Sequence, residues 1–356
     1  MRILFLTALV TTVAAFTTPF LGRARAETNT DARISGPFTY ENLTIYFIHG
    51  ESAPGPAPLT LQEALAKGTV RVVETGTVNE LKVENLGEED VYIQSGDIVK
   101  GGRQDRVLTV SFVLPRKSGE VPISSYCVEH GRWSARGSED ATKFASAYNL
   151  MPSREAKLAM KAPSRPAALA GARPADRASY SSTGTSERQQ VVWSEVAKTQ
   201  EKLSANINAP VASPESASSL ELSLENDKLK KLRSQYIEAL EGKAGADDIV
   251  GFAFAVNGRI NSADVYPSNA LFRKMWNKLL TASVTEAVSE RLNAANFAEP
   301  SVEAVRAFLQ NAENGKANVE KVGALAEQDI RDADAALFVQ AARSNGSWVH
   351  RNYLAK

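Results

Sequence analysis

The chain has 356 residues, which is enough for one large domain or two ordinary domains with a sizeable core. Hydrophobic residues make up 43% and charged residues 23% of the sequence, as in globular rather than fibrous or disordered proteins. Lysine plus arginine and aspartate plus glutamate balance at 41 each, so no basic excess favours a nucleic-acid partner.

Residues 1–26 have the pattern of a secretory signal peptide. Arg2 comes before an apolar run at 3–16, and a small-x-small cleavage motif ends at Ala26. Cleavage after Ala26 removes three arginines and no acidic residue, which leaves a net charge of −3. The alternative is an uncleaved anchor, although the run is short for a span and Pro19 follows it. We expect a periplasmic or secreted protein with no membrane span after cleavage.

The next segment, 35–160, is predicted to be rich in antiparallel strands. β-branched and aromatic residues dominate short runs that Gly, Pro, Asn and Asp separate. Close turns between short strands favour a sandwich or half-barrel over parallel βαβ units. A short helical turn is expected at 61–66. The expected strands are 43–48, 69–74, 81–86, 91–94, 107–114 and 121–128.

A flexible, exposed linker is predicted at 161–188. This stretch is rich in Pro, Gly and Ser and has almost no large apolar side chains. It therefore cannot bury enough surface to offset the conformational entropy of the chain. A second, shorter linker is expected at 208–219, where small and polar residues again dominate.

The segment 189–356 is predicted to combine helices with hairpins. Apolar side chains recur at helical spacing in 189–205 and 227–241, and Ser268 and Ser301 are placed to cap two further helices. Two hairpins are predicted from turn dipeptides that accept positive φ, at Asn257-Gly258 and Asn345-Gly346. The expected fold class is α+β, with an antiparallel strand-rich N-terminal half, a helical middle and C-terminal hairpins packed with helices.

Residues 127–133 form the first candidate site. Cys127 and Glu129 are two positions apart on a predicted strand and share one face, and Arg132 follows just past its end. In one interpretation Cys127 is a nucleophile, Glu129 a base, and Arg132 a clamp for phosphate or carboxylate. In the other, the cysteine is core, and Glu129 and Arg132 form a structural salt bridge. As the single cysteine, Cys127 has no partner for an intramolecular disulfide.

The second candidate site is the run Gly101-Gly102-Arg103-Gln104-Asp105-Arg106. Two glycines allow a tight turn whose N–H groups can bind an anion, and the two arginines would add positive charge. The alternative is an ordinary β-turn with solvated charges. The spacing is not that of a P-loop, because the Lys-Ser/Thr pair and the strand-to-helix switch are absent from the sequence.

Other kinds of chemistry have little sequence support. No HExxH or CxxC pattern indicates a metal site, and no G-x-S-x-G elbow indicates a serine hydrolase. The histidines are scarce, and His130 is the candidate general base because it adjoins Glu129. The tryptophans favour packing over base stacking. The sequence identifies no cofactor.

Four segments carry a resemblance to a known bacterial family. They read GDIVKGGRQDR, VP-x4-CVEHGRW, GFAFAVNGRI and LFRKMWNKLL. Together they resemble the ADP-ribosylglycohydrolase and rhodanese-phosphatase superfamily associated protein domain. The resemblance runs from about residue 38 to the C-terminus, which implies that 35–160 and 189–356 are two halves of one domain. The family motif corresponds here to Gly101, Gly102, Gln104, Asp105, Arg106, Cys127, Glu129, Gly131, Arg132 and Trp133.

The family name implies ligands related to ADP-ribose or phosphate and specifies no reaction. The leading hypothesis is an exported protein that binds such a small anionic ligand in an open pocket. The pocket is expected to be lined by Arg103, Asp105, Arg106, Glu129 and Arg132, with Gly101, Gly102, Gln104, His130 and Trp133 as further ligand contacts.

Hydrolysis is the expected reaction if the protein is an enzyme. Glu129 or Asp105 would activate water, and Cys127 is the third catalytic candidate. Export would require a substrate outside the cytoplasm, which disfavours a nucleotide of intracellular metabolism. The alternative is a non-catalytic envelope module that binds another protein or has a structural role.

Overall fold

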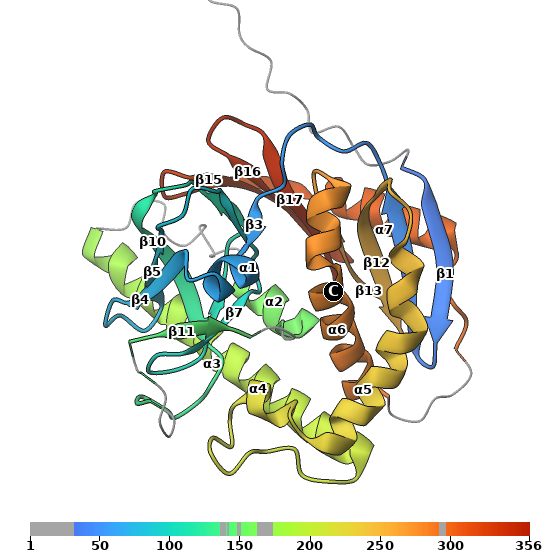
Figure 1. Cartoon of the computed structure of the whole chain (residues 1–356), viewed down its shortest axis with the longest axis horizontal. Coiled ribbons are helices and arrows are strands. Elements are labelled where there is room, and N and C mark those ends of the chain that lie inside the picture. Colours follow the sequence, from blue (N-terminus) through green and yellow to red (C-terminus); the bar gives the residue numbers. More distant parts are fainter. Residues whose placement is uncertain (1–31, 136–139, 141, 148–150, 162–173, 292–296) are drawn as a thin grey trace, which may run out of the picture.

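The computed structural model in Figure 1 describes residues 32–135, 140, 142–147, 151–161, 174–291 and 297–356. The chain is 32% helical and 34% strand, which confirms the α+β class. The predicted signal peptide at 1–26 lies outside the described residues. In the part of the chain that is described, no helix is both long enough and apolar enough to cross a membrane.

The larger sheet of the described residues has eight strands, and its neighbouring strands are antiparallel. In sheet order they are β1 (Ile34–Tyr40), β2 (Leu43–His49), β12 (Ile249–Val256), β13 (Arg259–Val265), β17 (Trp348–Ala355), β16 (Ala336–Arg343), β15 (Ala326–Asp332) and β14 (Lys316–Val322). The two hairpins predicted around Asn-Gly pairs are confirmed as β12–β13 and β16–β17.

Strand β2 belongs to this larger sheet, although the sequence placed it among the strands of the N-terminal half. It pairs with β12 along its length, for example Phe47 opposite Phe252. Both strands are buried at every position. Strands that are buried on both faces belong in the middle of a sheet, which explains this long-range pairing. Figure 1 shows the blue strand β1 on the same side of the molecule as β12 and β13, which come much later in the chain, and β2 lies between β1 and β12 in the sheet.

Two smaller sheets contain the other strands. The six-stranded sheet has the order β11 (Phe144–Ser146), β7 (Ile98–Gly101), β8 (Arg106–Leu108), β10 (Gly119–Cys127), β5 (Glu80–Asn85) and β4 (Val70–Glu74). The three-stranded sheet has the order β3 (Leu59–Thr60), β6 (Val91–Ile93) and β9 (Phe112–Leu114), and its β3–β6 pair is parallel. One hydrophobic cluster joins the two sheets, with Val83 and Leu108 from one and Ile93 and Leu114 from the other.

Helices cover both faces of the larger sheet. Trp276 and Leu279 of α6 pack in one cluster with Phe252 of β12, and Val305 and Leu309 of α7 pack in another. Ser268 and Ser301 cap these two helices, as predicted. The helices are α1 (Leu61–Ala66), α2 (Arg154–Lys161), α3 (Pro174–Ile207), α4 (Leu220–Ser223), α5 (Asp227–Leu240), α6 (Asn269–Ser289) and α7 (Val302–Glu313), with a 3₁₀ turn η3 (Glu241–Ala244) after α5.

Helix α3 begins inside the range predicted to be a linker. Residues 174–188 are helical and continue without a break into the predicted helix 189–205. Pro174 occupies the first helical position, where the missing N–H removes no intrahelical hydrogen bond. Residues 162–173 lie outside the described residues.

Candidate functional site

The two motifs singled out by the sequence lie on adjacent strands. Strand β8 pairs antiparallel with β10, and Arg106 is opposite Cys127. The backbone N–H of Val128 also donates to the carbonyl of Asp105 at 3.0 Å. The Gly-Gly segment enters β8 while the Cys-Val-Glu segment leaves β10. This antiparallel pairing therefore brings the two polar groups together.

Arg132 joins the two carboxylates of the predicted site. Its Nε lies 2.6 Å from Oε2 of Glu129, and its Nη2 lies 3.4 Å from Oδ1 of Asp105. Glu129 also accepts hydrogen bonds from the hydroxyl of Ser216 and, at 3.3 Å, from the backbone N–H of Asp105. Glu129 is 0% and Asp105 2% exposed. The carboxylates of Asp105 and Glu129 converge as predicted. They form buried ion pairs with Arg132, however, and do not line an open pocket.

The environment of Glu129 favours its charged form. Burial by itself would raise its pKa, but hydrogen bonds from Arg132 and Ser216 outweigh burial and hold the pKa below its ordinary value. A general base works best with a pKa near the operating pH and an oxygen free to accept a proton. Glu129 is therefore better suited to holding Arg132 in place than to activating water.

The Gly-Gly turn has no N–H group left for an anion. The N–H of Gly101 donates to Oδ1 of Asp105 at 2.9 Å, and that of Gly102 to the carbonyl of Lys143 at 3.0 Å. The N–H of Arg103 donates to Oε1 of Glu74 at 3.1 Å. Protein acceptors therefore take up the donors that an anion nest would need. This geometry agrees with the turn of the alternative interpretation but not with its solvated charges, because Asp105 and Arg106 are buried.

Arg106 is fully buried, although it was expected to line an open pocket. It donates to Oε1 of Gln104 at 3.1 Å and pairs with Glu74 at 3.4 Å. The Trp133 ring lies over it, with the guanidinium carbon 5.4 Å from the ring centroid, and Arg103 lies 5.6 Å from the same ring. The aromatic ring therefore covers two guanidinium groups through cation–π contacts.

Cys127 has the environment of a core residue. It is 0% exposed, and burial raises its pKa to about 11, so the thiol stays protonated at neutral pH. Its backbone N–H and carbonyl both pair with the Gln189 side chain at 2.8 Å.

His130 packs edge-on against Trp193, with the ring centroids 4.6 Å apart. Ser218 donates to the His130 carbonyl at 2.7 Å.

Sequence reasoning missed the serines that complete this cluster. Ser216 donates to Glu129, and Ser219 donates to Oδ2 of Asp105 at 3.5 Å. Both lie in the range 208–219, which the composition indicates is a linker. The serine-rich composition of this segment is the one feature of the sequence that could have drawn attention to it, and its distance along the chain gave no sign that it meets the motifs.

The family comparison agrees with these motifs. A family model for the ARG and Rhodanese-Phosphatase-superfamily-associated Protein domain matches residues 31–354. The chain belongs to this family. No curated protein and no solved structure shows significant similarity to it. Within this family domain, most of the motif residues are buried where β7, β8 and β10 meet, and Gly131 and Trp133 are exposed at the edge of this junction.

A large cavity of the family domain lies elsewhere, between the two sheet systems. Its volume is about 510 Å³, and we call it the inter-sheet cavity. Figure 1 shows β15 and β16 of the larger sheet near β10 and β5 of the smaller one. The lining residues are Asn79, Thr109, Val110, Ser124, Ser125, Tyr126, Met160, Lys161, Thr185, Arg188, Glu320, Lys321, Val322, Gly323, Gln328 and Ile330.

Three residues that line the inter-sheet cavity each carry a buried polar atom that lacks a partner among the described residues. These atoms are Oγ of Ser125, Nε2 of Gln328 and Oδ1 of Asn79. Ser125 is 1% and Gln328 7% exposed. A buried polar atom without a hydrogen-bond partner is costly, so a group that bonded to these atoms would be stabilising.

Positive charge predominates among the described residues that line this cavity. Lys161, Arg188 and Lys321 line it, against the single carboxylate of Glu320. Burial, followed by repulsion from Lys157, lowers the pKa of Lys161 to about 8. An anion placed beside Lys161 would offset both effects and stabilise its charged form.

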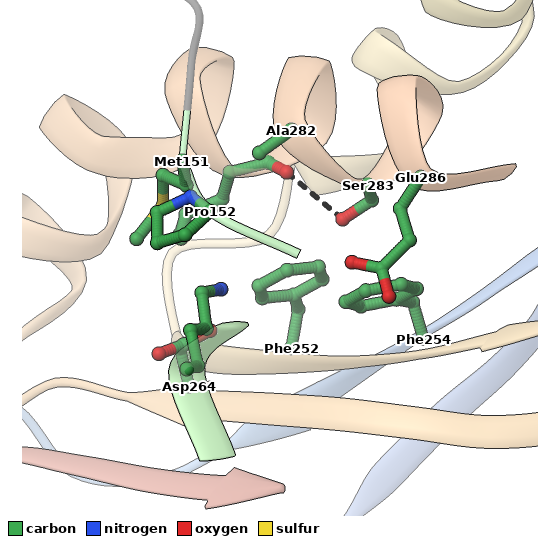
Figure 2. A pocket seen from close by; sticks show the side chains of 10 residues that line it. Met151, Pro152, Phe252, Phe254, Asp264, Ala282, Ser283 and Glu286 are labelled. Carbon is green, nitrogen blue, oxygen red and sulfur yellow. Dashed lines mark hydrogen bonds between the residues drawn. The ribbon is translucent and has the colours of Figure 1, made fainter. Parts of the chain in front are cut away.

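A second, much smaller cavity lies under α6 (Figure 2). It has a volume of about 10 Å³, which is room for about one water molecule. Figure 2 shows the rings of Phe252 and Phe254 below the helix and the carboxyl group of Glu286 beside them. Burial raises the pKa of Glu286. The cavity is too small for a substrate. In the described segments, no group of three or more His, Cys, Asp or Glu residues is arranged to hold a metal ion.

Proposed function

We propose that this protein binds a small anionic ligand, phosphate- or ADP-ribose-like, in the inter-sheet cavity. The observation that carries the proposal is that two residues in the lining of a cationic cavity, Ser125 and Gln328, each have a buried polar atom, Oγ and Nε2, with no partner among the described residues. A phosphate oxygen would accept hydrogen bonds from both atoms. The volume of about 510 Å³ lies within the range of roughly 300–1,000 Å³ that is common for small-molecule sites.

In this proposal the motif cluster acts as a scaffold for the cavity. Ser125 and Cys127 lie on the same strand, β10, and Arg106 opposite Cys127 is held by Gln104 and Glu74. The buried Glu129–Arg132 pair continues the cluster past the end of β10. These contacts fix the strand whose preceding residues line the cavity.

Hydrolysis by Glu129, Asp105 or Cys127 has less support than binding. The first two are paired with Arg132, and the pKa of Cys127 is about 11. The second candidate function is a non-catalytic structural or protein-interaction module of the envelope. It is favoured by the mutual satisfaction of Glu129 and Arg132 at 2.6 Å. We also propose export, and a purified mature chain that starts at Glu27 would support it.

Calorimetric titration of the mature chain with inorganic phosphate, pyrophosphate and ADP-ribose tests the binding proposal. Lys321→Met and Lys161→Met should each weaken binding by about tenfold, since each removes a charged partner of the anion. Lys316→Met is the matched control, because Lys316 is exposed on the same strand as Lys321 and does not line the cavity. Absence of binding by every anion, or equal loss in all three variants, would contradict the proposal.

A further inference from the structure

An apolar cavity adjoins the inter-sheet cavity. Its volume is about 420 Å³, and three residues, Val110, Val322 and Gly323, line both cavities. We call it the apolar cavity. The other lining residues are Phe112, Ser118, Glu120, Val121, Pro122, Ile123, Ala324, Leu325 and Ala326, most of which are apolar.

The same strands pass from one cavity to the other. On β10, residues 120–123 line the apolar cavity and residues 124–126 line the inter-sheet cavity. On β15, Ala326 lines the first and Gln328 the second. Positions 121 and 125 of β10 are about 13 Å apart at the usual rise of a strand. The lining therefore changes from apolar to cationic along one continuous path.

We propose that the ligand is a monomeric amphiphile with an anionic head group and a single medium-length apolar chain. The head group binds in the inter-sheet cavity, and the chain lies in the apolar cavity. This inference rests on the proposed function, because it uses the same anion site. If the ligand had no apolar chain, water would fill the apolar cavity beside the head group. Burying an alkyl chain in this cavity instead is favourable.

The chain-length dependence of affinity tests this inference. The mature chain would be titrated with inorganic phosphate and with methyl, butyl and octyl phosphate, below the concentration at which micelles form. Affinity should rise by about threefold to fourfold for each buried methylene. Octyl phosphate should therefore bind far more tightly than methyl phosphate.

Two variants assign the effect to the apolar cavity. Ala324 is exposed in the turn between β14 and β15 and lines this cavity, so Ala324→Trp should fill it and abolish the chain-length dependence. Phosphate affinity should remain. Ser344→Trp is the matched control, since Ser344 is exposed in the turn between β16 and β17 and lines neither cavity. If Ala324→Trp does not fold, Val121→Thr keeps the side-chain shape and should selectively weaken octyl phosphate.

The outcomes separate this inference from the proposed function. If phosphate binds and affinity does not change with chain length, the proposal of an amphiphilic ligand is wrong, and the proposed anion site remains supported. If neither phosphate nor any alkyl phosphate binds, the proposed function fails as well. Binding only to phosphatidic acid vesicles, with none to octyl phosphate monomers, would overturn the inference, because a bilayer surface would then be the ligand.

Discussion

Two buried serines, Ser111 and Ser125, differ in the hydrogen bonding of their hydroxyl groups. Ser111 is hydrogen-bonded to Nδ1 of His350 at 2.9 Å and accepts from the N–H of Ser95 at 2.9 Å. Within the part of the chain that is described, Oγ of Ser125 has no partner. The two residues are 2% and 1% exposed. Equal burial with opposite hydrogen bonding makes them a matched pair.

Alanine substitutions should therefore affect stability in opposite ways. Ser111→Ala leaves two buried groups unpaired and should lower the free energy of unfolding by about 1–3 kcal/mol. Ser125→Ala removes an unsatisfied hydroxyl and should leave the free energy unchanged or raise it slightly, while it weakens anion binding. Denaturant unfolding and titration of both variants measure these effects. A large loss of stability in Ser125→Ala would show that its hydroxyl has a protein partner.

The Glu129–Arg132 pair gives a pH-dependent prediction. The folded-state pKa of Glu129 lies below its ordinary value of 4.5. The pair therefore contributes stability above pH 4.5, and this contribution is lost as the pH falls through the folded-state pKa. Arg132→Met should cost about 3 kcal/mol at pH 7, because it leaves a buried charge unpaired.

The difference in unfolding free energy between the wild type and Arg132→Met should narrow as the pH falls from 7 to 3. Glu129→Gln provides the control, because an amide does not titrate. A constant difference across this range, measured by denaturant unfolding, would contradict the ion pair.

At the residue scale, the sequence predicts which neighbouring residues can form an ion pair better than it predicts what surrounds a side chain in the fold. The closeness of Glu129 and Arg132 in the sequence indicated that they could form a salt bridge, and they do. It could not show that Ser216 completes the cluster, because 87 residues separate Ser216 from Glu129. The environment of Ser125 could not be predicted from the sequence either, because it depends on strands from the end of the chain.

At the scale of elements, the Gly-Gly turn is constrained by close packing. Gly102 has a φ of +53°, and a Cβ there would lie 2.2 Å from Cζ of Phe144. Gly131, in the neighbouring motif, has a φ of +83° with nothing within 4 Å of such a Cβ. The two glycines share a backbone conformation and differ in free space.

Alanine scanning of these glycines should separate the two effects. Gly131→Ala should cost about 1 kcal/mol, from the left-handed conformation alone. Gly102→Ala should cost clearly more, because the Phe144 ring and the Glu74 carboxylate must move as well. Thermal unfolding of both variants provides the measurement. Equal losses would show that packing against Phe144 is not the constraint.

Locally determined elements were predictable, and long-range ones were not. The Asn257-Gly258 turn and the Ser268 and Ser301 caps depend on a few neighbouring residues, and the structure confirms them. Strand β14 was missed because its sequence, KANVEKV, is almost entirely exposed and has no apolar face. It forms through pairing with β15 along its whole length.

At the scale of the molecule, the two ends of the chain share one sheet. Strand β1 pairs with β2 and β2 pairs with β12, so the sequence halves interlock and do not form separate layers. Sequence composition cannot show this arrangement, because pairing between distant strands depends on the whole core. The interlocking also brings β14 and β15 beside β10, which creates the inter-sheet cavity that no single motif indicated.

Hydrogen–deuterium exchange with and without saturating pyrophosphate tests the location of the anion site most directly. The account predicts slower exchange in residues 119–126 and 316–332, which form the walls of the inter-sheet cavity. Residues 98–106 and 128–133 should exchange as they do in the free protein. Protection confined to 98–106 and 128–133 would place the anion at the Glu129–Arg132 cluster and contradict the account.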